Sequence, residues 1–570
     1  MISMSCRIHG GDFDHGGQAT RQLKEHLVRL GVSGAVMRRA MIASYEAEMN
    51  VVIHARTGTL WARVGDGTLD LEIADEGPGI PDVGLALREG WSTASARARE
   101  LGYGAGLGLP NIRKNSDRFD LETRVGRGTR VRSTIFLEEG SAAKAPAAAA
   151  SVAAEEGSPD TSQGPEERAL AISPRRCTRC LRCIFSCPTG ALRVHADGPI
   201  LRASLCVGCT ECASACARTA FGIREDLRLK RELPVTGQDA VLVVPRACLL
   251  SPFAGRSAAA VLNALGGLGF SEVRFTEEWE DAIRGEARLL ASRPGAPVPL
   301  IPPLCPAVAA LVESRFPSLI PNLAMMAFPL DAAGEEFPLR PVVLVAACAA
   351  QLASASSSSL TDRLTVTTPA GLCAALRAGA PRPQTPWSAA QAERAPEHPA
   401  AQAAAPAPAL RAPRPPLAQE AHELRASGVR DVLRALSAAE SGALGGITVL
   451  NLHLCAHGCS GSPFVTPDPF LSELAGPRLQ PLLAGARETD ACVLRRSAPY
   501  RQRTGMRLSA DMASAIQALG RIDELLRTLP GRDCGACGAP TCALYAEDVV
   551  MGRAGSASCP HASLTPEVSP

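Results

Sequence analysis

The chain has 570 residues, of which 20 are cysteine, and a formal net charge of +2 at pH 7. This length exceeds one hydrophobic core, and at about 150 residues per domain it predicts roughly four domains. The near-neutral charge argues against a polyanionic partner such as nucleic acid. The sequence has no apolar run of about 18 residues and no apolar signal-peptide core, so a cytoplasmic protein without a membrane span is expected.

Two segments rich in Ala and Pro divide the chain. They cover residues 138–170 and 378–418, and neither has the period of a helix or a strand. Such a composition predicts linkers without a packed core. The chain is therefore expected to contain an N-terminal unit, a cysteine-bearing centre that the second linker interrupts, and a short C-terminal unit.

The first motif of the N-terminal unit lies on a helix expected over residues 33–56. Glu46, Asn50 and His54 are spaced four residues apart and therefore share one face of this helix. Asn50 can offer a carbonyl oxygen to Mg²⁺, which prefers hard oxygen ligands. Glu46, one turn earlier, is placed to orient or deprotonate a nucleophile near a γ-phosphate. His54 is most simply a packing residue or a partner of the glutamate.

The second motif follows a strand expected over residues 69–74. The strand leads into Asp75, and Gly77 and Gly79 come directly after it. A carboxylate at a strand end can accept a hydrogen bond from the adenine amine, while the glycines let the backbone turn tightly.

Two further glycine-rich segments complete the set. A loop leads into a helix expected over 110–116 and offers backbone N–H groups to phosphates. A Gly-Arg-Gly turn then places Thr129 before a strand expected over 130–136. The glycines of the loop are Gly104, Gly106 and Gly108.

Each motif alone is weak, because a single glycine-rich loop is more often a plain turn. In this order they resemble the GHKL ATPase fold of gyrase B, Hsp90, histidine kinases and MutL. The helix pattern E-x-x-x-N-x-x-x-H-A most resembles the anti-sigma-factor serine kinases. That resemblance implies an α/β sandwich in which Glu46 is the catalytic base, Asn50 holds Mg²⁺ and Asp75 binds adenine. It also implies ATP as substrate, a sigma factor or anti-sigma antagonist as partner, and a homodimer through this domain.

Eight cysteines form two copies of the spacing C-x-x-C-x-x-C-x-x-x-C. Tight runs of this kind suit metal ligation far better than disulfides, and four thiolates hold a [4Fe–4S] cube. Zinc is the alternative, although two triple-thiolate loops exceed what paired zinc sites need. The two runs are Cys177, Cys180, Cys183, Cys187 and Cys206, Cys209, Cys212, Cys216.

These runs resemble a two-cluster bacterial ferredoxin over residues 172–222, which implies a small α+β fold. The resemblance also implies a crossed ligand pattern, in which the fourth cysteine of each run serves the other cluster. Cys216 would then complete the first set, and Cys187 the second.

The next four cysteines, Cys305, Cys348, Cys455 and Cys459, are sparse. Scattered single cysteines are usually buried apolar residues. Their order and local sequence nevertheless resemble the catalytic domain of [FeFe]-hydrogenases over about 240–485. The resemblance implies an α/β domain in which the four thiolates hold a further cube, with Cys459 as the bridge to a two-iron subcluster.

This central unit departs from the hydrogenase pattern at the residues that serve turnover. Leu304 stands where that family has its proton-relay cysteine, and Gln351 where it has a cyanide-holding lysine. The segment interrupted by the second linker is also short. These departures argue against hydrogen turnover and favour a cluster-bearing sensory domain. An active hydrogenase and a domain without a cluster are the alternatives.

The C-terminal cysteines have the spacing C-x2-C-x4-C-x16-C. They are Cys534, Cys537, Cys542 and Cys559. The spacing resembles the small iron–sulfur domain of electron-bifurcating and ion-translocating reductases and of hydrogenase-like sensors, which implies a small helical domain with a [4Fe–4S] cluster. The remaining thiols, interpreted as ordinary, are Cys6, Cys248, Cys373 and Cys492.

Together these motifs predict a multidomain α/β protein that couples iron–sulfur clusters, and a redox partner protein, to an ATP-binding domain in signalling. The alternatives are a hydrogenase-type electron-transfer enzyme with a regulatory ATPase domain, and an electron-transfer scaffold with an inactive ATPase. The expected units are an ATP-binding domain (1–137), a linker (138–170), a ferredoxin domain (171–225), a hydrogenase-like domain in two parts (238–377 and 419–490) around the second linker (378–418), and a C-terminal cluster domain (515–562).

Overall fold

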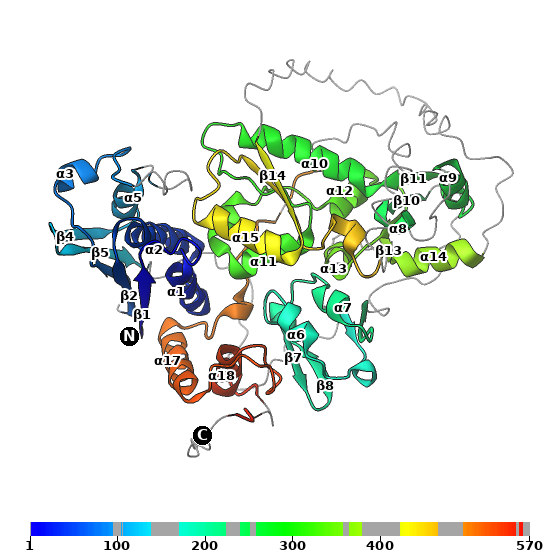
Figure 1. Cartoon of the computed structure of the whole chain (residues 1–570). Helices are drawn as coiled ribbons and strands as arrows, with labels where there is room; N and C mark the ends of the chain where they lie inside the picture. The colour runs from blue at the N-terminus through cyan, green and yellow to red at the C-terminus, as the bar shows by residue number, and fades with distance from the viewer. Residues whose placement is uncertain are drawn as a thin grey trace.

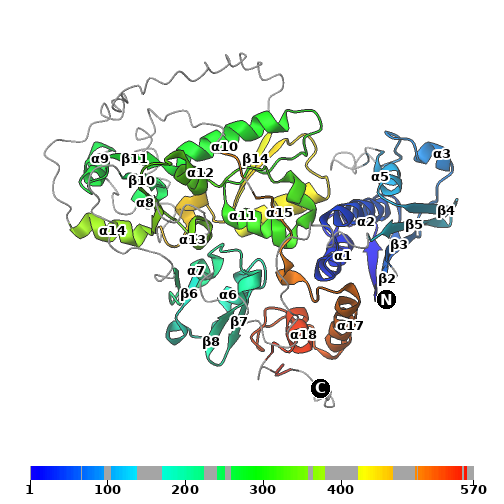
Figure 2. The ribbon, with the colours of Figure 1, turned by 180° about the vertical axis from the view of Figure 1, so that it is seen from behind.

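The computed structural model describes residues 2–65, 67–94, 104, 106–137, 170–223, 240–250, 258–356, 364–378, 422–465, 494–496, 498–554 and 558–561. Most of both predicted linkers, and Cys492, lie outside these residues. Within them, no helix is long and apolar enough to cross a membrane. The N-terminal and central units lie side by side, with the ferredoxin and C-terminal units below them (Figures 1 and 2). The predicted mixed α/β multidomain architecture is confirmed.

The N-terminal unit is a five-stranded antiparallel sheet in the order β1-β2-β3-β5-β4, with its long helices on one face. Strand side chains alternate between a buried and an exposed face, and Leu60, Leu71 and Ile135 of the inner face are almost fully buried. The elements are β1 (Ile2–His9), α1 (Gln18–Arg29), α2 (Gly34–His54), β2 (Thr57–Gly65), β3 (Thr68–Asp75), α3 (Val83–Ala86), α5 (Gly108–Lys114), β4 (Arg118–Arg124) and β5 (Gly128–Phe136).

Two side chains fix the long helices of this unit. The Ser33 side chain accepts a hydrogen bond from the Val36 N–H and so caps α2. The buried Glu48 carboxylate of α2 accepts from the N–H groups of Ala19 and Thr20, at 3.1 and 2.9 Å. Because these N–H groups open α1, Glu48 supplies the acceptor that the first turn of α1 lacks.

The ferredoxin unit is built from two similar halves, as the internal repeat predicts. The β6–β9 pair closes one end and the β7–β8 hairpin the other, both antiparallel. The two short helices of the repeats, α6 and α7, pack against each other. The elements are β6 (Leu170–Ile172), η2 (Pro174–Arg176), α6 (Arg182–Ser186), β7 (Leu192–His195), β8 (Gly198–Leu201), η3 (Ala203–Leu205), α7 (Glu211–Ala215) and β9 (Phe221–Ile223).

The central unit has a four-stranded parallel sheet in the order β11-β10-β12-β13. The two inner strands, β10 and β12, are fully apolar and buried because helices cover both faces of the sheet. The sheet and its connections are β10 (Val241–Val244), α8 (Ala247–Leu250), α9 (Ala258–Gly266), β11 (Glu272–Phe275), α10 (Thr276–Ala291), α11 (Pro306–Arg315), η4 (Pro317–Asn322), α12 (Pro329–Glu336), β12 (Val342–Val345), α13 (Ala349–Ser356), β13 (Leu364–Thr367) and α14 (Pro369–Ala378).

The chain after the second linker forms a separate parallel strand pair within the central unit. Strands β14 and β15 pair in parallel, and a helix connects them. Strand β15 packs against α10 and α11, so the chain on the two sides of the linker belongs to one folded unit. The elements are β14 (Glu423–Ser427), α15 (Val429–Glu440), β15 (Val449–His453) and η6 (Gly458–Gly461).

The C-terminal unit consists of η8 (Thr504–Met506), α17 (Met512–Thr528) and α18 (Cys542–Val550). It lies between the N-terminal unit and the ferredoxin unit (Figures 1 and 2). The buried Leu519 and Ile522 of α17 belong to the same hydrophobic core as the N-terminal helices. Burial of two such side chains contributes about 1.5–3 kcal/mol each, so this contact is a packed domain interface.

Polar contacts reinforce both sides of the C-terminal unit. The Leu508 N–H donates to the Arg29 carbonyl at 3.0 Å, and the Arg29 guanidinium pairs with Glu547 at 3.4 Å. On the other side, the buried Asp548 carboxylate pairs with both Arg193 and Arg202 of the ferredoxin unit. The C-terminal unit therefore joins the N-terminal unit to the ferredoxin unit.

A second junction joins α1 directly to the central unit. The ammonium of Lys24 pairs with Glu440 at the end of α15 and lies 3.5 Å from the centre of the Phe316 ring. Burial lowers the pKa of Lys24 to about 8, although the charge of Glu440 opposes the shift. On α2, Arg38 donates to Asn322 at 3.3 Å.

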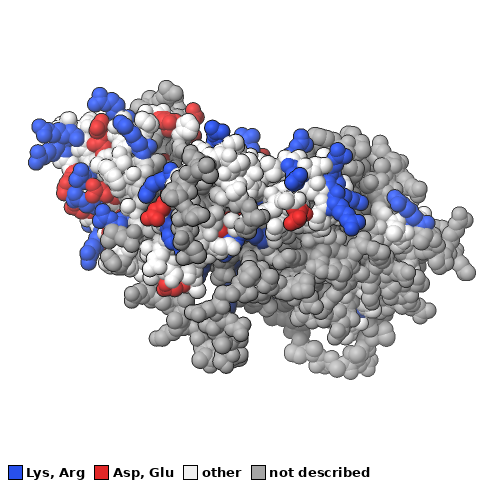
Figure 3. Space-filling view, turned by 90° about the horizontal axis from the view of Figure 1, so that it is seen from below, with Lys and Arg blue, Asp and Glu red and all other residues white. Residues whose placement is uncertain are grey.

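Seen from below, basic and acidic side chains are interspersed at the end of the molecule that holds the N-terminal unit (Figure 3).

Candidate functional site: the nucleotide site and the cysteine clusters

Helix α2 carries the predicted catalytic face, and it packs against α5. The Glu46 carboxylate accepts a hydrogen bond of 2.7 Å from the side chain of Asn111, a residue of α5. Burial raises the pKa of Glu46, and the bond from Asn111 opposes the shift. A partly buried carboxylate with a raised pKa is suited to proton transfer. Asn111 was not predicted from the sequence, and its only signal is its place one turn after the glycine-rich loop.

Asn50 lies one turn after Glu46 and meets the start of α5. A methyl group on Gly108 would lie 2.8 Å from the Asn50 Oδ1 atom, so the backbone at the start of α5 lies directly against the Asn50 side chain. The side-chain oxygen of Asn50 and the first turn of α5 therefore face the same space. His54, at the end of α2, is exposed to solvent. Desolvation of its ring by the neighbouring protein lowers its pKa.

Asp75 is held at the end of β3 by two backbone bonds. Its Oδ1 atom accepts from the N–H groups of Gly77, at 2.8 Å, and Thr129, at 3.2 Å. Burial raises the pKa of Asp75, while these two bonds oppose the rise. The structure thus brings Thr129 together with Asp75 and Gly77, which lie in a different segment of the chain. The second carboxylate oxygen has no such bond among the described residues, as an adenine acceptor requires.

The glycines around this site have the conformations that other residues avoid. Gly79 has a φ of 73°, and a side chain there would collide with the Arg124 carbonyl. Gly104 and Gly106 also have positive φ values. Much of the predicted loop from Gly102 to Ala105 lies outside the described residues, so its path is not described.

The first ferredoxin set converges from both repeats. Burial raises the pKa of Cys183 to about 11, and the neighbouring thiols of Cys177, Cys180 and Cys216 add to the rise. The Arg179 N–H points to the Cys177 Sγ at 3.3 Å. Crowded thiols with inward N–H groups suit a cationic cluster, whose charge stabilises the thiolates.

The second set mirrors the first. Burial, and then the thiols of Cys206 and Cys187, raises the pKa of Cys212. The Ala191 N–H points to the Cys187 Sγ at 3.2 Å. The structure therefore groups the fourth cysteine of each run with the other run, which is the arrangement that the ferredoxin resemblance implies.

The four cysteines of the central unit also meet. They come from the starts of α11 and α13 and from the chain that follows β15. Burial, and then the thiol of Cys305, raises the pKa of Cys348 to about 12. Burial raises the pKa of Cys455, and the thiols of Cys348 and Cys305 add to the rise. The fourth cysteine, Cys459, lies within electrostatic reach of the other three. These donors suit one [4Fe–4S] cube.

The two positions at which the chain departs from the hydrogenase pattern, Leu304 and Gln351, are both buried. Leu304 is buried in the core, where it offers no proton. Gln351 donates from its amide to the Cys459 Sγ at 3.6 Å, and its carbonyl oxygen accepts from the Ala347 N–H at 2.7 Å. The second bond fixes the orientation of the amide, so its NH₂ group faces the thiol.

Three of the C-terminal cysteines are close together. Burial raises the pKa of Cys537, and the thiols of Cys559 and Cys534 add to the rise. Cys542 is the first residue of α18, where Thr541 caps the helix and the Cys542 N–H donates to Asp533 at 2.6 Å. The loop from Cys534 to Cys542 turns through Gly535 and Gly538, both with positive φ.

The cysteine loops of different units approach one another. A methyl group on Gly535 would lie 2.9 Å from the ring of Phe185, which lies inside the first ferredoxin run between Cys183 and Cys187. A methyl group on Gly208, inside the second run, would lie 3.1 Å from Ala350, two residues after Cys348. The order in space is therefore C-terminal loop, first ferredoxin run, second ferredoxin run, central cysteines.

Three family models match parts of the chain. Residues 38–139 match the histidine kinase-, DNA gyrase B- and HSP90-like ATPase. Residues 170–193 match the 4Fe-4S binding domain, and residues 529–561 match a putative Fe-S cluster family. An ATPase domain, a 4Fe-4S domain and a C-terminal Fe-S domain are thus confirmed in the predicted order.

Curated relatives of the N-terminal unit are bacterial regulators. The serine/threonine-protein kinase RsbT of Bacillus subtilis (strain 168) is 30% identical over 124 residues, which are 21% of this chain and 87% of that protein. An anti-sigma F factor of Caldanaerobacter subterraneus subsp. tengcongensis is 32% identical over 97 residues, which are 16% of this chain and 64% of that protein.

Similar solved structures include two of the [FeFe]-hydrogenase HydA1 from Chlamydomonas reinhardtii. One has 15% identity and a TM-score of 0.29, and covers 49% of this chain and 90% of its own. The other has 15% identity and a TM-score of 0.31, and covers 48% of this chain and 88% of its own. Because these TM-scores are low, the structural similarity carries no argument about the central unit. Its resemblance to hydrogenases rests on the sequence motifs.

Proposed function

Because the chain belongs, through its N-terminal domain, to the family of the serine/threonine-protein kinase RsbT, we propose that it is an iron–sulfur signalling protein with kinase activity. In this proposal the oxidation state of its clusters controls how the ATPase domain acts on a regulatory protein of the sigma-factor or anti-sigma-antagonist kind. The fusion of an ATPase domain with two kinds of iron–sulfur domain in one chain supports it.

The observation that carries the proposal is the position of the C-terminal cluster unit. Its helix α17 shares a hydrophobic core with α1 and α2, and its next helix pairs through Glu547 with Arg29. The unit bearing Cys534, Cys537, Cys542 and Cys559 is therefore built into the ATPase domain rather than tethered to it. A change in the cluster loop can reach the nucleotide site through packed helices alone.

At the nucleotide site, each residue has a distinct task in the proposed phosphotransfer. Glu46 takes the proton of the attacking hydroxyl, and Asn111 holds its carboxylate in place. Asn50 provides a side-chain oxygen for Mg²⁺. Asp75 accepts from the adenine amine with the oxygen that Gly77 and Thr129 do not occupy.

The cysteines that would hold the clusters form four sets of four. Bound clusters would supply reversible one-electron storage. Two sets lie in the ferredoxin unit, one in the central unit and one in the C-terminal unit. They are Cys177, Cys180, Cys183, Cys216; Cys187, Cys206, Cys209, Cys212; Cys305, Cys348, Cys455, Cys459; and Cys534, Cys537, Cys542, Cys559.

Two assays on the anaerobically reconstituted full chain separate this proposal from the hydrogenase-type alternative. The first measures ATP-dependent phosphotransfer to serine-containing anti-sigma antagonists, and activity is expected in the parent but not in Glu46→Ala. The second measures hydrogen evolution from reduced methyl viologen after loading with a two-iron cofactor. Absence of phosphotransfer together with robust hydrogen evolution would favour the enzyme reading and contradict the proposal.

A further inference from the structure

We propose that Glu280, His453 and Cys459 form a binding site for a single divalent transition-metal ion, and that Zn²⁺ matches this donor set. The site shares Cys459 with the four central cysteines and adds two residues, Glu280 and His453, that the cysteine motifs do not include. It goes beyond the proposed signalling function, because the three side chains form it whether or not a cube is bound.

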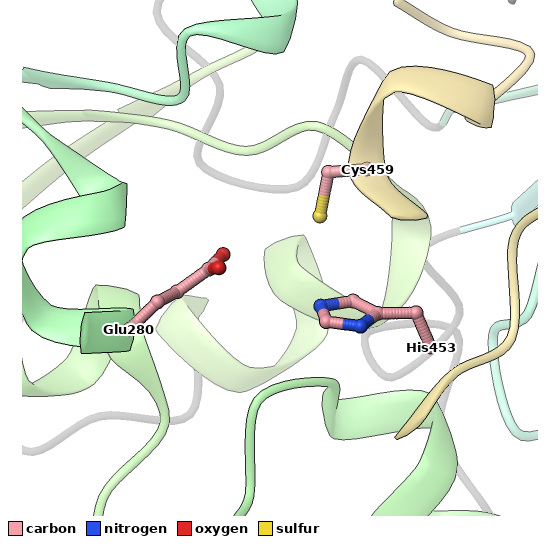
Figure 4. A group of neighbouring side chains, drawn as sticks. All are labelled: Glu280, His453 and Cys459. Carbon is pink, nitrogen blue, oxygen red and sulfur yellow. The ribbon is translucent and has the colours of Figure 1, made fainter. Parts of the chain in front are cut away.

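Three separate elements bring the donors together. Glu280 projects from α10, His453 ends β15, and Cys459 lies in η6. One ligand atom from each lies within 4.8 Å of those of the other two. The three side chains point toward one common space (Figure 4). Among the described residues, no other group of three His, Cys, Asp or Glu side chains brings its ligand atoms within 4.8 Å of one another.

The distances fit an ion after a small adjustment. A four-coordinate zinc ion with bonds of about 2.0–2.3 Å keeps its ligand atoms roughly 3.5 Å apart. Side-chain rotations that move these atoms by about 1 Å would therefore close the site, and such movements stay within one rotamer well. All three side chains are partly buried, so they are shielded from bulk water but not sealed from it.

The donor chemistry favours zinc. One thiolate, one imidazole and one carboxylate are the ligand types that this borderline ion accepts. Three protein ligands leave a fourth position open, as in zinc sites that hold a water molecule or a small ligand. Mg²⁺ and Ca²⁺ prefer oxygen ligands alone and are excluded by the sulfur and nitrogen donors.

Neighbouring residues hold two of the ligands in place. Arg284 pairs with the Oε2 atom of Glu280 at 2.8 Å and leaves the Oε1 atom for an ion. The Gln351 amide donates to the Cys459 Sγ at 3.6 Å and is itself fixed by the Ala347 N–H. Supporting bonds of this kind orient ligands in metal sites.

Cys459 also belongs to the set proposed for the central cube. With a cube present, its thiolate would bridge an iron of the cube and the divalent ion. Without a cube it would be a terminal ligand of the ion. The iron count and the zinc count therefore report on the two assignments separately.

The test uses the full chain, reconstituted anaerobically with iron and sulfide, given zinc chloride and passed over a chelating resin. Zinc, iron and sulfide are then measured per chain. We expect the parent to retain about one zinc ion with one sulfur ligand near 2.3 Å and nitrogen or oxygen ligands near 2.0–2.1 Å in zinc X-ray absorption spectra.

The variants Glu280→Gln and His453→Asn should each bind zinc at least about tenfold more weakly, with iron and sulfide unchanged. Asp281→Asn is the matched control, because Asp281 pairs with the same Arg284 at 2.7 Å but is not a ligand, and it should retain zinc. Unchanged iron in each variant shows that the fold is intact.

Two results would overturn the inference. One is equal zinc retention by the parent and by the double variant Glu280→Gln/His453→Asn. The other is a zinc spectrum with four sulfur ligands, which would place the ion in a cysteine loop. A parent that carries about twelve irons per chain instead of about sixteen, and that retains zinc while the two variants lose it, would support the zinc site and contradict the central cube.

Discussion

At the scale of single residues, the nucleotide site is a pair of carboxylates in different surroundings. Glu46 is bound by a single side-chain donor from α5, whereas Asp75 is bound by two backbone N–H groups. The first carboxylate stays available for a proton, and the second is fixed in direction. Different environments assign different tasks to chemically similar groups.

This division predicts opposite effects of two substitutions. Glu46→Ala should lower phosphotransfer by roughly 10²–10⁴-fold, the range for a lost general base, and leave ATP affinity largely intact. Asp75→Asn should weaken ATP binding by about ten- to a hundredfold, because it replaces a charged acceptor. Calorimetric ATP titration and a phosphotransfer assay on both variants check this. Two variants that bind and react like the parent would contradict both roles.

Asn111→Ala tests the environment of Glu46. The bond from Asn111 opposes the rise in the pKa of Glu46 that burial causes. Its removal should raise this pKa further, so a higher pH is needed to form the carboxylate. The acidic limb of the pH–rate profile should therefore move to higher pH. If the acidic limb of the profile stays at the same pH and only the maximal rate falls, Asn111 merely positions α5 and does not affect the pKa of Glu46.

At the scale of elements, helix α1 links the nucleotide site to the other units. Its N-terminus is capped by Glu48 of α2, its middle pairs through Lys24 with Glu440, and its end contacts the C-terminal unit through Arg29. Helix α1 thus contacts the rest of its own unit and two other units, the central and the C-terminal. A displacement of α1 would be felt by α2, which carries the catalytic face.

The Lys24–Glu440 junction should show strong coupling in a double-mutant cycle. Lys24→Met and Glu440→Gln should each destabilise the folded chain, because each leaves a buried polar partner unpaired. The double variant should cost less than the sum, with a coupling of roughly 1–3 kcal/mol. The coupling free energy is measured by titrating each variant with denaturant and using the susceptibility of the N-terminal unit to proteolysis as the readout of unfolding. Simple additivity would contradict the coupling.

The same lysine predicts a pH dependence. Burial lowers its pKa to about 8 in the folded chain, while an unfolded lysine titrates near about 10.4. Between these values the unfolded state binds more protons, so the contribution of Lys24 to stability rises with pH and is smallest below about pH 8. The difference in stability between the parent and Lys24→Met should therefore change from pH 8 to pH 10. A constant difference would contradict the lowered pKa.

At the scale of the whole molecule, the cysteine loops form a continuous series from the ATPase-bound C-terminal unit to the central unit. Glycine contacts at Gly535 and Gly208 bring neighbouring loops together. Inter-unit contacts of this kind explain how one chain could transmit the state of the central unit to the nucleotide site.

The central set has a direct test in metal content. Cys348→Ser should lower the iron of anaerobically reconstituted protein by about four per chain and leave the ferredoxin signals unchanged. Cys248→Ser is the control, because Cys248 is a buried thiol outside all four sets and should keep its iron. Equal iron in the two variants would show that Cys348 is only a core thiol.

The sequence predicted the elements whose pattern is local. The helix expected over 33–56 is α2, and the strand expected over 130–136 is β5, each within a few residues. The convergence of side chains from distant segments was harder to predict from the sequence. Asn111, Glu280 and His453 carry no spacing signal, since each belongs to an ordinary helix or strand and meets its partners only through the fold. The placement of α17 in the N-terminal core is of the same kind, because an amphipathic helix does not reveal what it covers.

The most direct test of redox control measures the ATP affinity of the full, cluster-loaded chain in its oxidised and its dithionite-reduced states. Calorimetry under anaerobic conditions gives both values, and the bleaching of visible absorbance confirms that the clusters are reduced. We predict affinities that differ by about fivefold or more, the range of ordinary allosteric coupling, and a smaller difference in Cys537→Ser. Equal affinities in the two states, with reduction confirmed, would contradict the proposed function.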